Sequence, residues 1–101
     1  MVAHWEPDGV DTSLSPLLVH GHLDVVPARK RTDWSVPPFS GEVVDGCIWG
    51  RGAVDMKDFD AMVLSVVRAR ARAGAAPRRP IRLIFTADEE AGSGLGAQWL
   101  G

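Results

Sequence analysis

The chain has 101 residues and a net charge of −2, from 11 basic and 13 acidic side chains. Its hydrophobic fraction of 46% and charged fraction of 24% are those of an ordinary soluble protein, which argues against a disordered or fibrous chain. No apolar run is long enough to cross a bilayer, and the start "MVAHWEPDG" lacks the pattern of a secretory signal. We therefore expect a cytoplasmic protein with no membrane partner, forming one domain or part of one. Cys47 is the only cysteine, which leaves no intrachain disulfide and no cysteine zinc cluster.

The first half of the sequence is typical of strands joined by polar loops. A turn-rich stretch, 6–16, separates Trp5 from the apolar residues 17–19, which indicates a hairpin or a loop feeding a buried strand. Residues 27–40 are polar and then broken by prolines, as in a loop. Asp45-Gly46 lies between two short apolar runs and predicts a type I′ hairpin turn, because glycine accepts positive φ without strain.

The spacing of apolar residues then changes to that of a helix. Five apolar side chains recur at helical intervals and form one stripe: Phe59, Met62, Val63, Val66 and Val67. Asp55 and Asp58 are placed to cap or charge the N-terminus of this helix, and Gly74 with Pro77 ends it. The pattern therefore predicts an amphipathic helix that lies with one face on a core.

A second buried strand is predicted after the helix. Residues 81–85 are mostly apolar rather than alternating, which is typical of a strand covered on both faces. Ser93 is placed to cap a further helix. The order of hairpin, helix, strand and helix, without a repeat or an interdomain linker, predicts an α/β fold.

Six arginines fall between Arg68 and Arg82 with no acid among them. Such a cluster could bind nucleic acid, or it could be the solvated face and C-terminal end of the helix, where cations suit the helix dipole. Nucleic-acid modules usually add stacking aromatics or a recognition motif, and neither is near this cluster. We favour the helix-end interpretation and predict no nucleic-acid partner.

Acidic and imidazole side chains gather at three places: His22 and Asp24 after the first buried strand, Asp55 before the helix, and Asp88, Glu89 and Glu90 after the second. If the two strands are parallel, these places meet in the crevice where α/β sheets bind ligands. Carboxylates gathered there repel one another unless a cation neutralises them. Histidine with carboxylates suits Zn²⁺, with Mn²⁺ or Co²⁺ as substitutes. A lone His-x-Asp is more often a strand-end hydrogen bond, but the three places together favour a metal.

Two pairs of residues in this set are predicted to divide their roles. His22 and Asp24 are two apart, so on a regular strand they would share a face, and Asp24 could orient the ring of a ligating His22. Adjacent glutamates are most often just exposed charge. Glu89 and Glu90 directly follow a buried strand, however, and their diverging side chains let one bind metal while the other faces the substrate as a base.

Three segments resemble the N-terminal signatures of the M20 metallopeptidase/amidohydrolase family: "HGHLDVVP", "W..PPFSGEVVDGCIWGRGAVDMK" and "TADEEAGS". Their order, spacing and context match from about residue 17 to 100. The family includes aminoacylases, acetylornithine deacetylases, succinyl-diaminopimelate desuccinylases and carboxypeptidases. The resemblance implies a catalytic domain of the zinc-exopeptidase type, with a mixed sheet and flanking helices. It also implies hydrolysis of an amide bond in a small peptide or an N-acyl amino acid.

The resemblance assigns a role to each residue that matches a family position. His22 and Glu90 would be metal ligands, Asp55 would bridge two Zn²⁺ ions, and Asp24 would orient His22. Glu89 would be the general base and acid. Co²⁺ or Mn²⁺ could replace Zn²⁺, and a cis peptide bond is expected just after Asp55. The remaining polar and aromatic side chains nearby are assigned to structure or to no site role: His4, His20, Cys47, Trp49 and Arg51.

Other parts of the family pattern have no match in this sequence. Family members have a further carboxylate ligand downstream, a final histidine ligand, and a lid domain used in dimerisation. Residues 1–101 carry three of the five expected ligands, so we expect one partial catalytic domain without lid or dimerisation elements, inactive alone and with uncovered apolar faces. A non-catalytic remnant that binds a metal or a partner is the alternative. Deacylase and peptidase activities remain equally open.

Overall fold

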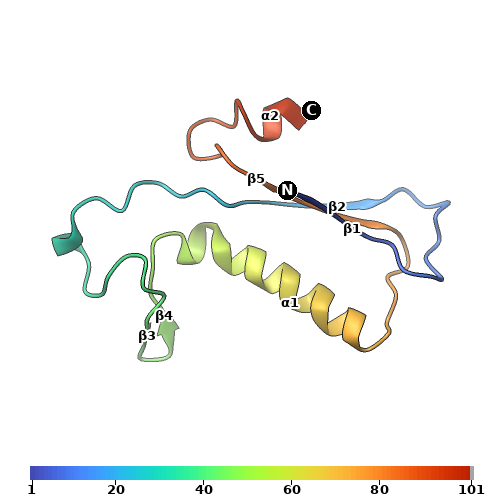
Figure 1. Ribbon diagram of the computed structural model, residues 1–101, viewed down its shortest axis with the longest axis horizontal. Coiled ribbons are helices and arrows are strands. Elements are labelled where there is room, and N and C mark those ends of the chain that lie inside the picture. Colours follow the sequence, from blue (N-terminus) through green and yellow to red (C-terminus); the bar gives the residue numbers. More distant parts are fainter. Residues whose placement is uncertain (101) are drawn as a thin grey trace.

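The computed structural model describes residues 1–100 and forms a thin α/β layer that measures 53 × 35 × 13 Å (Figure 1). Its strands are β1 (Val2–Trp5), β2 (Leu17–His22), β3 (Val43–Val44), β4 (Cys47–Ile48) and β5 (Ile81–Thr86). Its helices and helical turns are η1 (Arg31–Asp33), η2 (Ala53–Lys57), α1 (Asp58–Arg72) and α2 (Ala97–Leu100). A mixed sheet with helices confirms the predicted α/β class. Within the described residues, no helix has both the length and the apolar character that a membrane span needs.

The main sheet has the order β1-β5-β2, so β5 is its central strand. β2 pairs with β5 in parallel, from Leu17 opposite Ile81 to His22 opposite Thr86. β1 pairs with β5 in the antiparallel sense, so β1 and β2 flank the same strand and do not form a hairpin with each other. The parallel pair brings the carboxyl ends of β2 and β5 to the same edge of the sheet, as the predicted site requires.

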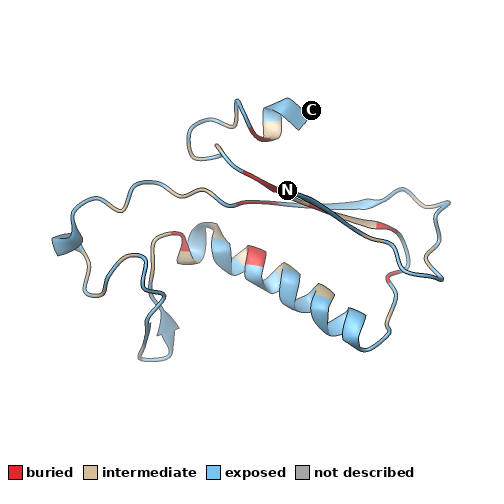
Figure 2. Ribbon diagram, in the orientation of Figure 1, coloured by how far each residue is buried: buried red, intermediate tan, exposed pale blue. Residues whose placement is uncertain are grey.

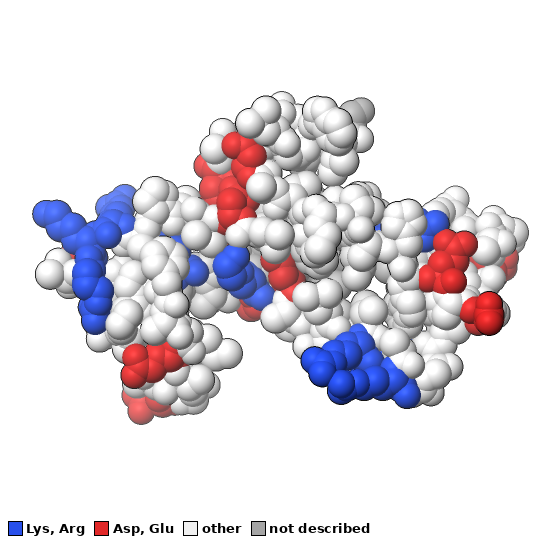
Figure 3. All heavy atoms as spheres, in the orientation of Figure 1, with Lys and Arg blue, Asp and Glu red and all other residues white. Residues whose placement is uncertain are grey.

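Helix α1 confirms the helix predicted from the apolar stripe. Asp58 is its first residue and accepts the N–H of Phe59 through Oδ1 at 2.7 Å, whereas Asp55 does not cap the helix. Gly74, with φ of 64°, ends the helix as predicted. Figure 3 shows basic side chains gathered over the far end of α1, where its arginines are exposed, in agreement with the helix-end interpretation of this cluster.

The core between α1 and the sheet is small. Leu83 and Phe85 on β5 are its fully buried apolar side chains, and Figure 2 shows how few residues are buried. A groove of about 450 Å³ lies between α1 and the sheet, and Met62 on its rim is 57% exposed. Leu18 on the edge strand β2 is also 57% exposed. The uncovered apolar faces expected from the sequence are therefore present.

Two predicted turns have different outcomes. Asp45 and Gly46 both have positive φ, 52° and 76°, which confirms the hairpin between β3 and β4. Ser93 was expected to cap a helix, but α2 begins only at Ala97, and Ser93 itself has a φ of 64°. The loop before α2 is held instead by Asp88, whose Oδ2 accepts the N–H of Leu95 at 2.8 Å.

Asp60 is an acidic side chain whose burial the sequence did not reveal. It is 6% exposed on the sheet side of α1, and neither carboxylate oxygen has a hydrogen-bond partner among the described residues. Burial raises the pKa of the Asp60 carboxyl, because burial penalises the charged form more than the nearby charges of Lys57 and His22 favour it. A Cβ at Gly21 would collide with Asp60 Oδ1, so glycine at this position of β2 makes room for the carboxylate.

Candidate metal centre

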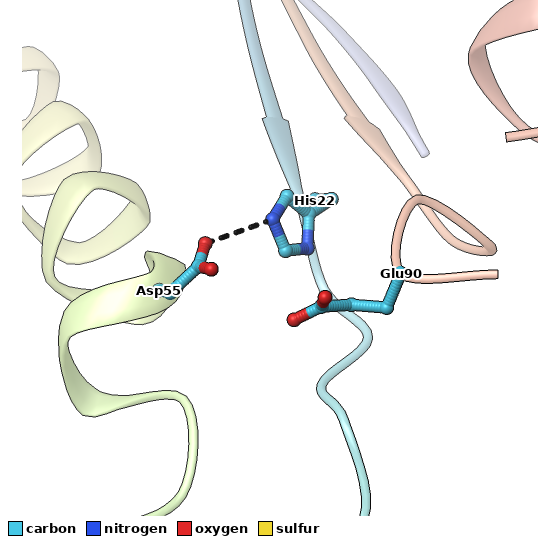
Figure 4. A group of neighbouring side chains, drawn as sticks. All are labelled: His22, Asp55 and Glu90. Atoms are coloured by element: carbon cyan, nitrogen blue, oxygen red, sulfur yellow. Dashed lines mark hydrogen bonds and ion pairs between the residues drawn. The ribbon is translucent and has the colours of Figure 1, made fainter. Parts of the chain in front are cut away.

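Three ligand-type side chains from distant parts of the chain meet beside the end of β2. His22 is the last residue of β2, Asp55 lies in η2 before α1, and Glu90 follows β5. Each offers one ligand atom, and these atoms all lie within 4.8 Å of one another (Figure 4). The parallel pairing of β2 with β5 brings His22 and Glu90 together, and η2 places Asp55 opposite them.

The imidazole of His22 is buried, at 5% exposure, and both ring nitrogens face oxygen atoms. Nδ1 lies 3.1 Å from the backbone carbonyl of Asp24, to which it donates a hydrogen bond in the Nδ1–H form. Nε2 lies 3.2 Å from Asp55 Oδ1 and 3.6 Å from Glu89 Oε2. The carbonyl therefore fixes the ring so that Nε2 points into a group of carboxylates.

Asp24 contacts both His22 and the segment after β5. The two residues do not share a strand face as expected, because β2 ends at His22 and the chain turns there. The carboxylate Oδ1 of Asp24 lies 3.5 Å from His22 Nδ1, farther than the backbone carbonyl. Its Oδ2 accepts the N–H of Glu90 at 3.0 Å. Burial alone would raise the pKa of Asp24, but the amides of Glu90 and Glu89 hold it below its ordinary value.

The turn that carries Asp55 has an irregular backbone. The Asp55–Met56 peptide bond is cis, as the resemblance predicted, and both residues depart from helical angles. Gly52 opens the turn with φ of 78°, and a Cβ there would collide with Val25. This agrees with the prediction that glycine permits a close backbone approach. The Asp55 side chain is 74% exposed and points at His22 rather than along the helix axis.

The paired glutamates differ in exposure and in their neighbours. Glu90 belongs to the group within 4.8 Å and lines a cavity of about 230 Å³ together with Asp55 and Arg51. The side chain of Glu89 is 46% exposed, with Oε2 3.6 Å from His22 Nε2. Both carboxylates therefore reach the site, with Glu89 on its solvent side.

Side chains that the sequence assigned to structure do have structural contacts. His20 Nε2 lies 2.9 Å from the Thr86 hydroxyl across the sheet. The guanidinium of Arg51 stacks 5.1 Å from the ring centre of Trp34. Cys47 is exposed in the hairpin, away from the carboxylates.

Without metal, the stability of the chain should fall as the pH rises above neutral. Burial of the ring would lower the pKa of His22, but its hydrogen bonds to Asp24 and Asp55 and the charge of Glu89 together raise it. A raised folded-state pKa means that protonated His22 contributes stability fully present below about pH 6.5, which is lost as the pH rises through the folded value. Melting temperatures in chelator across this range would show the loss. An equal loss in His22→Gln would contradict this assignment.

These observations define a class of site: imidazole and carboxylate donors without cysteine, at the carboxyl ends of parallel strands, which is a donor set typical of divalent-metal hydrolases. The family model described as Peptidase family M20/M25/M40 matches residues 18–101. The chain therefore belongs to this family of peptidases and related hydrolases.

Several curated proteins align with nearly the whole chain. The "Probable carboxypeptidase S-like 2" of Dictyostelium discoideum is 42% identical over 96% of this chain and 18% of its own length. The "Succinyl-diaminopimelate desuccinylase 2" of Shewanella loihica is 36% identical over 98% of this chain and 28% of its own length. A zebrafish (Danio rerio) N-fatty-acyl-amino acid synthase/hydrolase is 37% identical over 88% of this chain and 17% of its own length. The chain thus spans less than a third of each relative.

Proposed function

We propose that this chain supplies part of the metal site of an amide-bond hydrolase of the zinc-exopeptidase type. The observation that carries the proposal is the convergence of His22, Asp55 and Glu90 within 4.8 Å. Membership of the M20/M25/M40 family supports hydrolysis as the chemistry. We further propose a cytoplasmic location.

The residues present fit a divalent ion. One imidazole nitrogen and two carboxylate oxygens are ligands that suit Zn²⁺, with Co²⁺ or Mn²⁺ as substitutes. His22 Nδ1 already has an acceptor in the Asp24 carbonyl, which leaves the lone pair of Nε2 available when the ring is neutral. Bound divalent ions would lower the pKa of a water molecule and polarise the scissile carbonyl.

The remaining carboxylates have separate tasks in this proposal. Glu89, on the solvent side of the site, accepts the proton of the attacking water and returns it to the leaving amine. Asp24 holds Glu90 through the Glu90 amide, and its own carbonyl orients His22. Each carboxylate is thus assigned to the ion, to the proton or to positioning.

The substrate class proposed is a small amide that releases an amino acid. The relatives' names give a carboxypeptidase, a desuccinylase and a fatty-acyl-amino acid hydrolase. What these three share is an amide bond next to an amino-acid unit. We therefore propose an N-acyl amino acid or a small peptide as the substrate.

Metal binding and turnover test the proposal in sequence. We expect the chelator-treated chain to bind Co²⁺ in calorimetry and to develop the visible absorption of a ligated ion. The loaded chain is then incubated with N-succinyl amino acids, N-fatty-acyl amino acids and dipeptides, and the released amine is measured. Failure to bind Co²⁺ would contradict the proposed site. Binding without turnover on any substrate would favour the non-catalytic, metal-binding alternative.

A further inference from the structure

The peptide of Leu23 links all three segments that carry the ligand-type side chains. Leu23 lies between His22 and Asp24 in the first segment. Its N–H donates to the carbonyl of Thr86 at 2.8 Å and so extends the parallel ladder toward Glu90. Its carbonyl accepts the ammonium group of Lys57 at 2.6 Å, across 34 residues of sequence. Only the second of these links depends on a side chain.

Lys57 holds the turn that carries Asp55 at two points. Its backbone N–H donates to the carbonyl of Gly52 at 2.9 Å, which closes η2 around Asp55. Its side chain then joins η2 to the end of β2 through Leu23. Within residues 1–100 its ammonium forms no ion pair with a carboxylate, so the oxygens of Asp55 and Glu90 stay available for a cation.

We propose that Lys57 is a positioning residue of the metal site, which holds Asp55 against His22 by donating to the Leu23 carbonyl. This inference rests on the proposed function for its consequence, since Lys57 touches neither ion nor substrate. The distance it maintains is the 3.2 Å between His22 Nε2 and Asp55 Oδ1. Loss of residues that orient metal ligands typically weakens metal binding by about 10 to 100-fold.

Three variants test the proposal. Lys57→Met keeps the length of the side chain and removes the donor, and Lys57→Arg keeps a donor. Lys30→Met is the matched control, because Lys30 is exposed and its side chain has no hydrogen bond among the described residues. Far-UV circular dichroism and melting temperature report whether each variant folds. If Lys57→Met does not fold, Lys57→Gln, which retains a shorter neutral donor, replaces it.

The hydrogen bond is measured first, in the metal-free chain. We expect the carbonyl ¹³C resonance of Leu23 to move upfield in Lys57→Met and to stay in place in Lys30→Met. Co²⁺ affinity should then fall by about ten-fold in Lys57→Met, recover most of that loss in Lys57→Arg, and remain unchanged in Lys30→Met. An unmoved Leu23 resonance, or a Co²⁺ affinity equal to that of Lys30→Met, would overturn the proposal.

Failure of the proposed function is separable from failure of this inference. If the unaltered chain binds no Co²⁺, the metal site is refuted, and the role of Lys57 is then judged from the metal-free chain alone. Nuclear Overhauser contacts between the His22 ring and the Asp55 side chain should be present in the unaltered chain and lost in Lys57→Met. Their persistence in Lys57→Met would overturn the positioning role.

Discussion

Replacement of His22 by glutamine should reduce the affinity of the chain for Zn²⁺ or Co²⁺ by more than about 100-fold. His22 supplies the nitrogen donor of the group within 4.8 Å, and its ring is already oriented by the Asp24 carbonyl. A glutamine amide has no comparable lone pair at the position of Nε2. Even the loss of a partner that only orients a ligand weakens metal binding by about 10 to 100-fold, and removal of the ligand itself should exceed that range. Calorimetric titration of the chelator-treated proteins measures the effect.

His20→Gln is the matched control for this experiment. His20 is two residues away on the same strand, but its Nε2 pairs with the Thr86 hydroxyl and lies outside the ligand group. We expect its Co²⁺ affinity to match that of the unaltered chain. Equal losses in the two variants would show that metal binding responds to disruption of β2 and not to the ligand.

Replacement of Glu89 by glutamine should lower amide hydrolysis by about 10² to 10⁴-fold and leave metal affinity nearly unchanged. Glu89 reaches the site from its solvent side and is outside the ligand group, so glutamine removes a proton acceptor and keeps the shape of the side chain. The readouts are amine release and Co²⁺ titration, performed on the polypeptide that shows turnover. Glu42→Gln, an exposed change in the loop before β3, serves as the control.

Glu90→Gln separates the two neighbouring carboxylates. Glu90 belongs to the ligand group, so this variant should lose metal affinity first and turnover as a consequence. If Glu89→Gln instead weakened Co²⁺ binding as strongly as Glu90→Gln, the assignment of base and ligand would be reversed.

Local patterns predicted most elements because their causes are local. The apolar stripe on α1 and the Asp45-Gly46 turn depend on residues close in sequence, and both elements are present. The sheet order was not predictable in this way. β1 pairs with a strand almost 80 residues away, and Val2–Trp5 is too short to show which partner it takes.

The site was predicted in its membership more than in its contacts. Three acidic or imidazole groups at strand ends and a helix start indicated where ligands would meet, and the structure brings His22, Asp55 and Glu90 together. The contact of Asp24 with the Glu90 amide depends on a turn after β2 that spacing does not reveal. The reach of Lys57 to Leu23 likewise depends on how η2 faces β2.

The contact between Gly21 and Asp60 has an evolutionary consequence. Any side chain at position 21 would occupy the space that the Asp60 carboxylate now fills, so the two positions cannot drift independently. A homologue with alanine or a larger residue at the first position should carry a smaller or differently directed residue at the second. The pair would then appear as a correlated substitution that couples β2, one residue before His22, to the first turn of α1.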